Sequence, residues 1–143
     1  SDQLILDTIQ GNEEAVAAQI ERIHREETTP LFYHNEQSLR SVIKLAYFSY
    51  KDHYMKFEEL PSGDGYADVV YLPKKNSPLP VLIVELKWKK SADSALEQIR
   101  DRRYPEAVRD FGSDILLVGI SYDKDAPAGE RRHRCRIERY EEA

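Results

Sequence analysis

The sequence is poor in cysteine, in long apolar runs and in nucleotide-binding loops. Its single cysteine, Cys135, excludes an internal disulfide and a cysteine-built zinc site, and it fits a reducing, cytoplasmic location. No apolar run approaches the roughly 20 residues that a membrane-spanning helix needs, so no membrane partner is expected. No glycine-rich loop is followed by lysine and serine or threonine, so no P-loop is expected. The four histidines lack the spacing of metal ligands, and we expect them at the surface: His24, His34, His53 and His133.

A chain of 143 residues, of which 41% are hydrophobic and 33% charged, is typical of one globular domain. We expect a single domain over residues 1–143, with an accessory helical segment at 1–30 and a core at 31–143. The sequence starts at Ser1 without a methionine or a leader, so we expect it to be part of a longer protein.

The formal net charge of −5 argues against a protein that binds nucleic acid through charge alone, because such proteins present a basic surface. Basic residues nevertheless gather in two stretches, at 87–103 and at 131–139. On charge alone, these stretches are more typical of solvated surfaces than of phosphate-binding patches. Both interpretations stay open at this point.

Hydrophobic spacing predicts amphipathic helices over residues 13–27, 35–51 and 94–108. The second helix has an apolar stripe that reaches Glu36 when it is extended backwards by one turn. A carboxylate on the inward face of a helix needs an explanation, although near the N-terminus it can simply favour the helix dipole. The stripe consists of Leu39, Ile43, Ala46 and Tyr50.

Strands are predicted at 54–60, 66–72, 81–88, 114–121 and 135–139, the last as a half-exposed edge strand. The second and third form a hairpin across the loop that joins them. The helix between the third and fourth strands implies a parallel crossover. The sequence therefore predicts an α/β (α+β) fold with a mixed central sheet flanked by helices.

Three charged residues on this hairpin are predicted to converge. If Leu72 pairs with Val81 in a symmetric hairpin, Asp68 lies opposite Glu85, and opposed like charges are destabilising. Alternation places Lys87 on the same face as Glu85. Buried charges of this kind need pairing or a metal. The alternative is that Glu85 and Lys87 occupy an exposed strand end and Asp68 caps a turn.

Paired carboxylates offer hard oxygen ligands, which suit Mg²⁺ or Mn²⁺ rather than zinc or copper. A divalent ion lowers the pKa of bound water and neutralises charge that develops on a phosphate. The expected chemistry is therefore metal-assisted hydrolysis, in which Lys87 orients the water or supports the oxyanion.

Several stretches together resemble the PD-(D/E)XK nuclease superfamily, with a particular likeness to the nuclease-like domain at the C-terminus of bacterial AAA-ATPase-like proteins. The resemblance spans roughly residues 11–120. It implies a restriction-endonuclease-like αβββαβ core with an extra N-terminal helix. The stretches are Tyr33 to Glu36, Gly65-Tyr66-Ala67-Asp68, Val81 to Lys87, and Ala95 to Ile99 with Tyr104.

The resemblance implies a role for each of five residues. Asp68 and Glu85 would bind the metal, and Glu36 would complete the acidic set. Lys87 would position the attacking water. Gln98 would order the Lys87 side of the site, although an ordinary solvent-facing helix residue explains Gln98 as well.

Two functions remain open. The first is a metal-dependent nuclease that acts on DNA or RNA, with DNA favoured over RNA, and the intact acidic set with its lysine favours this function. The second is a catalytically inactive recognition module in a larger ATPase-containing protein, and the negative net charge favours it. Nucleases that cut both strands often pair their sites by two-fold symmetry, so a homodimer is a further open alternative.

Overall fold

The computed structural model describes residues 2–27, 36–62, 65–75, 77–88, 95–97, 114–123, 125–127 and 129–140. Within these ranges, the side chains of 26–27, 36–40, 59–62, 65–68 and 88 lie outside the description. The helices are α1 (Asp2–Ile9), α2 (Glu13–Glu27), α3 (Glu36–Ala46) and the 3₁₀ helix η1 (Phe48–Asp52). The strands are β1 (Tyr54–Ser62), β2 (Gly65–Pro73), β3 (Val81–Trp88), β4 (Ile115–Tyr122) and β5 (His133–Arg139). In the described part of the chain, no helix has the length and apolar character needed to cross a membrane.

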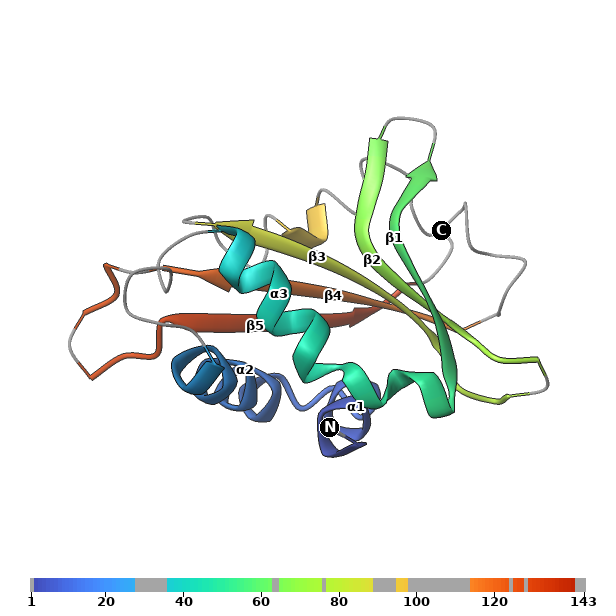
Figure 1. The fold of residues 1–143 in the computed structure, drawn as a ribbon, viewed down its shortest axis with the longest axis horizontal. Helices are drawn as coiled ribbons and strands as arrows, with labels where there is room; N and C mark the ends of the chain where they lie inside the picture. The colour runs from blue at the N-terminus through green and yellow to red at the C-terminus, as the bar shows by residue number, and fades with distance from the viewer. Residues whose placement is uncertain are drawn as a thin grey trace.

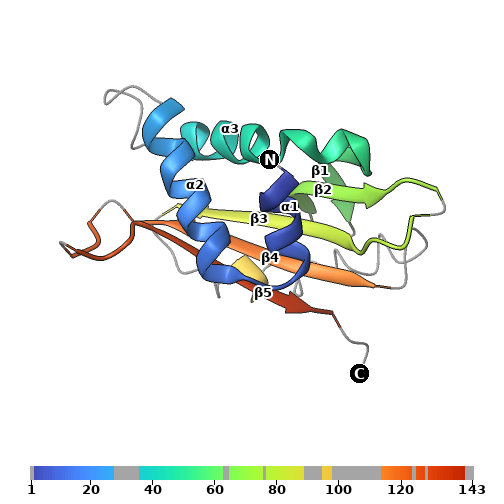
Figure 2. The same ribbon diagram turned by 90° about the horizontal axis from the view of Figure 1, so that it is seen from below.

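The five strands form one mixed sheet in the order β1-β2-β3-β4-β5. β3 and β4 are parallel, and the other neighbouring pairs are antiparallel. Helices α1, α2 and α3 lie together on one face of this sheet (Figures 1 and 2). The predicted α+β fold with a mixed central sheet, consistent with a restriction-endonuclease-like core, is therefore confirmed.

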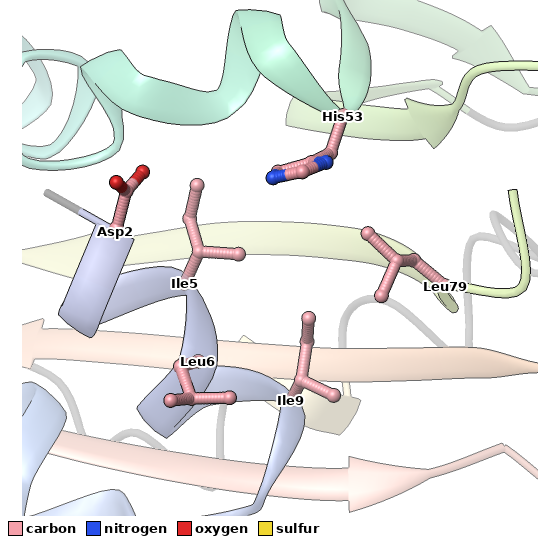
Figure 3. A pocket seen from close by; sticks show the side chains of 6 residues that line it. All are labelled: Asp2, Ile5, Leu6, Ile9, His53 and Leu79. Atoms are coloured by element: carbon pink, nitrogen blue, oxygen red, sulfur yellow. The ribbon is translucent and has the colours of Figure 1, made fainter.

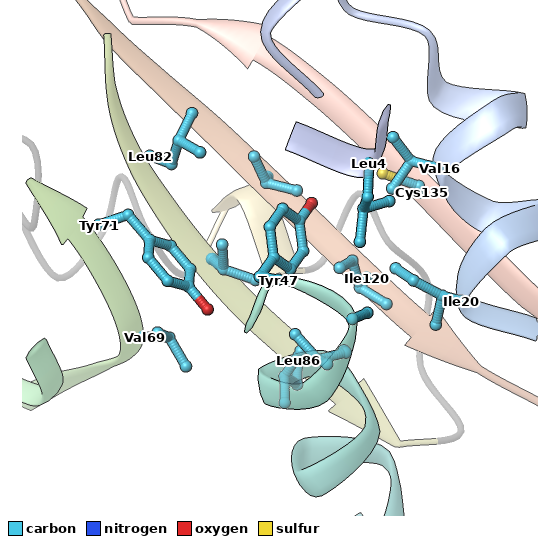
Figure 4. Close-up of a cluster of buried hydrophobic side chains, with 14 of the residues drawn as sticks. Leu4, Val16, Ile20, Tyr47, Val69, Tyr71, Leu82, Leu86, Ile120 and Cys135 are labelled. Atoms are coloured by element: carbon cyan, nitrogen blue, oxygen red, sulfur yellow. The ribbon is translucent and has the colours of Figure 1, made fainter. Parts of the chain in front are cut away.

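Alternation along the strands divides the apolar residues between two cores. On the helical face, Leu82, Val84 and Leu86 of β3 pack in the larger cluster with α1, α2 and α3 (Figure 4). On the opposite face, Val81 and Ile83 belong to a smaller cluster, which also contains a residue of the short helical piece at 95–97. The members of the smaller cluster are Val70, Leu72, Val81, Ile83, Leu96, Ile115 and Leu117.

Helix α3 ends at Ala46, so the prediction that it continues to residue 51 is wrong. Tyr47 leaves helical geometry, with φ −91° and ψ 16°, and the backbone N–H of Tyr50 then donates to the carbonyl of Tyr47 at 2.8 Å. That bond spans three residues and starts the 3₁₀ helix η1. Tyr47 is fully buried, with its ring centroid 5.5 Å from that of Tyr71. Packing of this aromatic side chain accompanies the end of the regular helix.

Helix α1 is a separate element that hydrophobic spacing did not resolve. The buried hydroxyl of Thr8 lies 2.7 Å from the hydroxyl of Tyr47, which links α1 to the end of α3. The buried carboxylate of Asp7 accepts side-chain hydrogen bonds from Asn12 at 3.1 Å and Gln19 at 2.7 Å. These bonds, with that from Asn12 first, hold the pKa of Asp7 below its usual value. Polar contacts therefore fix α1 against both α2 and α3.

Strand β5 is the predicted edge strand, and helix α2 covers its outer edge. The carboxylate of Glu13 accepts a hydrogen bond from the backbone N–H of Ile137 at 2.6 Å. The carboxylate of Glu21 accepts one from the backbone N–H of His133 at 3.3 Å and another from that of Arg132 at 2.7 Å. An exposed edge offers unpaired backbone groups to other chains, and a covering helix removes that hazard.

Candidate functional site

The hairpin of β2 and β3 has the register that the sequence predicts. Val69 pairs with Val84, Val70 with Ile83, and Tyr71 with Leu82. Continued by one residue, this register would put the backbone of Asp68 opposite Glu85, as predicted. The side chain of Asp68 lies outside the described residues, so its distance from Glu85 stays a prediction.

Glu85 and Lys87 share the face of the sheet that lies away from α1, α2 and α3. Val84 and Leu86 face the helices, so the residues that alternate with them face the other way. Glu85 is only 2% exposed, whereas Lys87 is half-buried. A buried carboxylate requires compensation by hydrogen bonds, a cation or a metal ion. Glu85 and Lys87 therefore share one face of the sheet, as predicted. Glu85 is buried there, and Lys87 is nearer to solvent.

The three pairs between β2 and β3 end next to Glu85. Beyond these pairs, the C-terminal part of β1 and the N-terminal part of β2 bend away from β3 together (Figure 1). On its other side, Glu85 is level with Gly119 of the parallel strand β4. Glu85 therefore lies where the sheet begins to divide, with its parallel neighbour still in place.

Glu36 is the first residue of α3, and the start of α3 lies beside the C-terminal end of β3 in both views (Figures 1 and 2). The buried residues Val42 and Ile43 of α3 belong to the cluster on the helical face. Glu36 would therefore have to approach Glu85 around the end of the sheet. Its side chain lies outside the described residues, so its place in the site stays a prediction.

The crossover helix predicted over 94–108 lies largely outside the described residues, and so does Gln98. Residues 95–97 are helical, and Ala95 and Leu96 are buried. Leu96 packs in the cluster of the face that carries Glu85. The described turn of this helix thus covers the predicted face, and the role of Gln98 stays a prediction.

No group of three or more histidine, cysteine, aspartate or glutamate side chains is arranged to hold a metal ion among the described residues. The side chains of Glu36 and Asp68 lie outside the described residues. The buried carboxylate of Glu85 fits a hard cation, because Mg²⁺ and Mn²⁺ prefer anionic oxygen ligands. The described part of the site thus provides one suitable ligand for such an ion.

The expectation that the histidines lie at the surface is wrong for two of them. His24 and His133 are buried, and Nδ1 of His24 lies 2.7 Å from Nε2 of His133. Nδ1 of His133 lies 3.2 Å from the carboxylate of Glu21. Burial lowers the pKa of His133 to about 4, so the ring is neutral at pH 7. His53 is exposed, as expected, and His34 lies outside the described residues.

A sequence signal for this buried pair exists. His24 follows the buried Ile20 by one helical turn, which places it on the inward stripe of α2. His133 alternates with the buried Cys135, which places it on the inward face of β5. Neither signal shows that the two side chains meet, because 109 residues separate them in sequence.

Four of the five arginines between residues 131 and 139 pair with carboxylates. Among the described residues, Arg131 lies 2.6 Å from Glu14, and Arg139 lies against Asp114. These exposed pairs favour the interpretation of a solvated surface over that of a continuous basic patch. The other pairs are Arg134–Glu130 at 3.3 Å and Arg136–Glu13 at 3.5 Å.

An apolar pocket of about 240 Å³ lies between α1 and the segment that leads into β3 (Figure 3). Leu79 precedes β3, whereas Glu85 and Lys87 lie in the second half of that strand. The pocket is therefore at the other end of β3 and takes no part in the candidate site. Its lining residues are Asp2, Ile5, Leu6, Ile9, His53 and Leu79.

Comparison with known families finds one match. The family model described as PD-(D/E)XK nuclease superfamily matches residues 34–129, which is more than half of the chain. The matched range includes all five residues expected in the site and excludes α1, α2 and β5. No curated protein matches the sequence.

Proposed function

Because the chain belongs to the PD-(D/E)XK nuclease superfamily, we propose that it is a metal-dependent nuclease that hydrolyses phosphodiester bonds of nucleic acid. The observation that carries this proposal is the buried Glu85 beside the half-buried Lys87 on one face of β3. The register of β2 and β3 is compatible with Asp68 as their partner, because continuing it by one residue would bring Asp68 opposite Glu85.

The metal in this proposal is Mg²⁺ or Mn²⁺, held by carboxylates of Glu85, Asp68 and Glu36. Strict alternation from Val70 would give Asp68 the same face as Glu85. Glu36 is a ligand only if its side chain reaches the end of β3. When bound, such an ion lowers the pKa of a coordinated water and neutralises charge on the phosphate.

Lys87 is proposed to orient the attacking water and to support the negative charge on the phosphate. Its ammonium has three donors on a flexible stem, and its half-buried position lets it reach a ligand from solvent. Gln98 is proposed to hold the Lys87 side of the site through its amide group.

The biological setting belongs to the same proposal. We expect DNA rather than RNA as the substrate, an ATPase-like domain in the same full-length chain, and a cytoplasmic location. A homodimer would allow two such sites to cut both strands of a duplex.

The second candidate function is a catalytically inactive module that keeps the fold and recognises a partner. The net charge of −5 favours it, and so do the carboxylates that match the C-terminal arginines. Such a module would bind without cutting, and divalent metal would leave its stability unchanged.

The test measures cleavage of labelled single- and double-stranded DNA and RNA with Mg²⁺ or Mn²⁺, and with a chelator as control. We expect metal-dependent cleavage by the wild type and a loss of at least about 100-fold in Glu85→Gln. Glu138→Gln is the matched control, because Glu138 lies two strands away on the same face of the sheet, and it should retain activity.

Metal binding gives a second readout that does not depend on finding the substrate. An ion that binds only the folded protein raises the free energy of unfolding by about 2.7 kcal/mol at one hundred times its Kd. Glu85→Gln should lose most of this gain. An unchanged wild-type melting temperature at several millimolar Mn²⁺, with no cleavage of any substrate, would favour the inactive module.

A further inference from the structure

Strand β1 forms the edge of the sheet opposite to β5. It pairs with β2 from Tyr54 to Ser62, and in the described part of the chain no other strand pairs with it. An edge strand presents outward N–H and carbonyl groups to which a strand of another chain can be added. The carboxylates of α2 occupy such groups on β5, so β1 is the edge that we consider for this role.

Two large apolar side chains of β1 are open to solvent. Met55 and Phe57 are each 42% exposed. Tyr54 packs in the cluster of the helical face, so the residues that alternate with it project to the opposite face. Their partners on β2, Leu72 and Val70, are buried in the smaller cluster of that face. The apolar surface of this cluster thus continues to the outer edge of the sheet.

The helical face of β1 has a lysine and a glutamate two residues apart. The carboxylate of Glu58 lies 2.5 Å from Nζ of Lys44 on α3 and 3.9 Å from Nζ of Lys56. The side chains of Glu58 and Lys56 keep contact with solvent, and such pairs contribute only about 0–1 kcal/mol. A carboxylate offers about four lone-pair sites, so Glu58 can accept a further lysine beside these two.

The charges of β1 favour one register for pairing with a second copy of the same strand. Two-fold symmetry pairs two copies of one edge in antiparallel direction, and the residue at the axis then lies opposite its own copy. An axis at Lys56, Glu58 or Glu59 would oppose like charges, which is destabilising. An axis at Phe57 puts Lys56 of each copy opposite Glu58 of the other. It also brings the two Phe57 side chains together.

The ends of β1 fit this register as well. With the axis at Phe57, the two strands overlap over residues 54–60. Pro61, which has no N–H to donate, falls just outside the overlap. An axis at Met55 would shorten the overlap to residues 54–56, because β1 begins there. The register about Phe57 therefore combines opposite charges with a long overlap.

We propose that the outer edge of β1 is an interface with a second copy of this chain, paired antiparallel about Phe57. The sheets of the two copies then join into one, with the helices of both on the same face. The proposed function left a homodimer without an interface. This proposal goes beyond it and depends on β1 alone, so it stands even if the nuclease function fails.

The first test locates the axis by cross-linking. Opposed residues have Cβ atoms about 4.5–5.5 Å apart, so mild oxidation should join two copies of Phe57→Cys through a disulfide. Met55→Cys is the matched control, because Met55 is equally exposed on the same face. In this register it lies about 14 Å along the strand from its own copy, which is beyond the reach of a disulfide. The native Cys135 is buried, and the wild type controls for it.

The second test exchanges the charges and measures the oligomeric state by sedimentation velocity at increasing protein concentration. We expect the wild type to form a dimer. Lys56→Glu and Glu58→Lys should each dimerise at least about tenfold more weakly, because every dimer contains the altered pair twice. A mixture of the two variants should dimerise again, because each then meets opposite charges. Thermal melting of each variant checks that the fold is intact.

Three outcomes would overturn the proposal. The wild type stays a monomer at every concentration, in which case Lys56 serves to protect an unpaired edge. Met55→Cys cross-links as fast as Phe57→Cys, in which case the register is wrong. The dimer persists in Lys56→Glu, in which case another surface forms it. Metal-dependent cleavage by a monomer would leave the nuclease function standing, whereas a dimer that cuts no substrate would leave only the interface.

Discussion

The two faces of the sheet are built for different purposes. The helical face packs three helices on an apolar core, and even its buried histidines and tyrosines contact one another or a neighbouring polar group. The other face has a smaller apolar cluster, and beyond it lie a buried carboxylate and a half-buried lysine. Stability is therefore concentrated on one face, whereas the groups suited to chemistry are concentrated on the other.

This difference predicts how the two faces respond to substitution. Residues of the helical face should change stability strongly and affect catalysis only through folding. The charged residues of the site face should change catalysis or binding and leave the stability of the metal-free protein nearly constant. Four predictions test the contrast in order of expected effect.

The largest effect is expected from Tyr47→Ala on the helical face. Removal of this fully buried ring leaves a cavity between α3 and Tyr71, at a cost of about 3–5 kcal/mol in the free energy of unfolding. Tyr47→Phe keeps the ring and loses only the contact with Thr8, so it should cost about 1 kcal/mol. Urea unfolding measures both, and equal costs would contradict the packing role of the ring.

The next effect is a pH dependence that His133 produces. The unfolded chain binds a proton near the ordinary pKa of 6.5, whereas the folded ring does so only near pH 4. The unfolded state thus holds more protons between these values, and folding stability falls as pH is lowered through this window, by roughly 2–3 kcal/mol. The groups that face the ring are His24, Glu21, Arg25 and Tyr122.

Urea unfolding between pH 4 and pH 7.5 measures this dependence. His133→Phe should flatten it, because the titrating group is gone. His53→Gln changes an exposed histidine and should leave the slope as in the wild type. A wild-type slope in His133→Phe would assign the dependence to other groups.

A smaller effect is expected at the covered edge of β5. Glu13→Ala removes the carboxylate that accepts the backbone N–H of Ile137 at 2.6 Å, which should cost about 1–2 kcal/mol. Glu14→Ala removes only an exposed ion pair with Arg131 and should cost about 0.5 kcal/mol or less. Thermal melts compare the neighbours, and equal shifts would show that the carboxylate does not secure the edge.

The smallest effect on stability is expected from Asp68→Asn on the site face. If Asp68 and Glu85 oppose each other, removing one charge should stabilise the metal-free protein by about 0.2–1 kcal/mol. The same change should abolish most of the stabilisation by Mn²⁺. A clear loss of stability without metal would instead assign Asp68 a structural role, such as capping a turn.

The sequence was a good guide wherever the pattern is local. Alternating residues define β3 at Val81–Trp88 as predicted, and the compact loop before it sets the register of the β2–β3 hairpin. The helix expected between β3 and β4 implied their parallel pairing, which the structure has. This local information predicted two features of the candidate site. One is that Glu85 and Lys87 share a face of β3, and the other is that Asp68 lies in β2.

The sequence by itself thus determined the five strands, helix α2 and the first part of α3, because periods of two and 3.6 residues are properties of the backbone. Only the tertiary structure decided which distant groups meet. It ended α3 at Ala46, where Tyr47 packs into the core, and it joined His24 to His133 across 109 residues. It also set carboxylates of α2 against the edge of β5. These contacts depend on how whole elements pack, which no local period records.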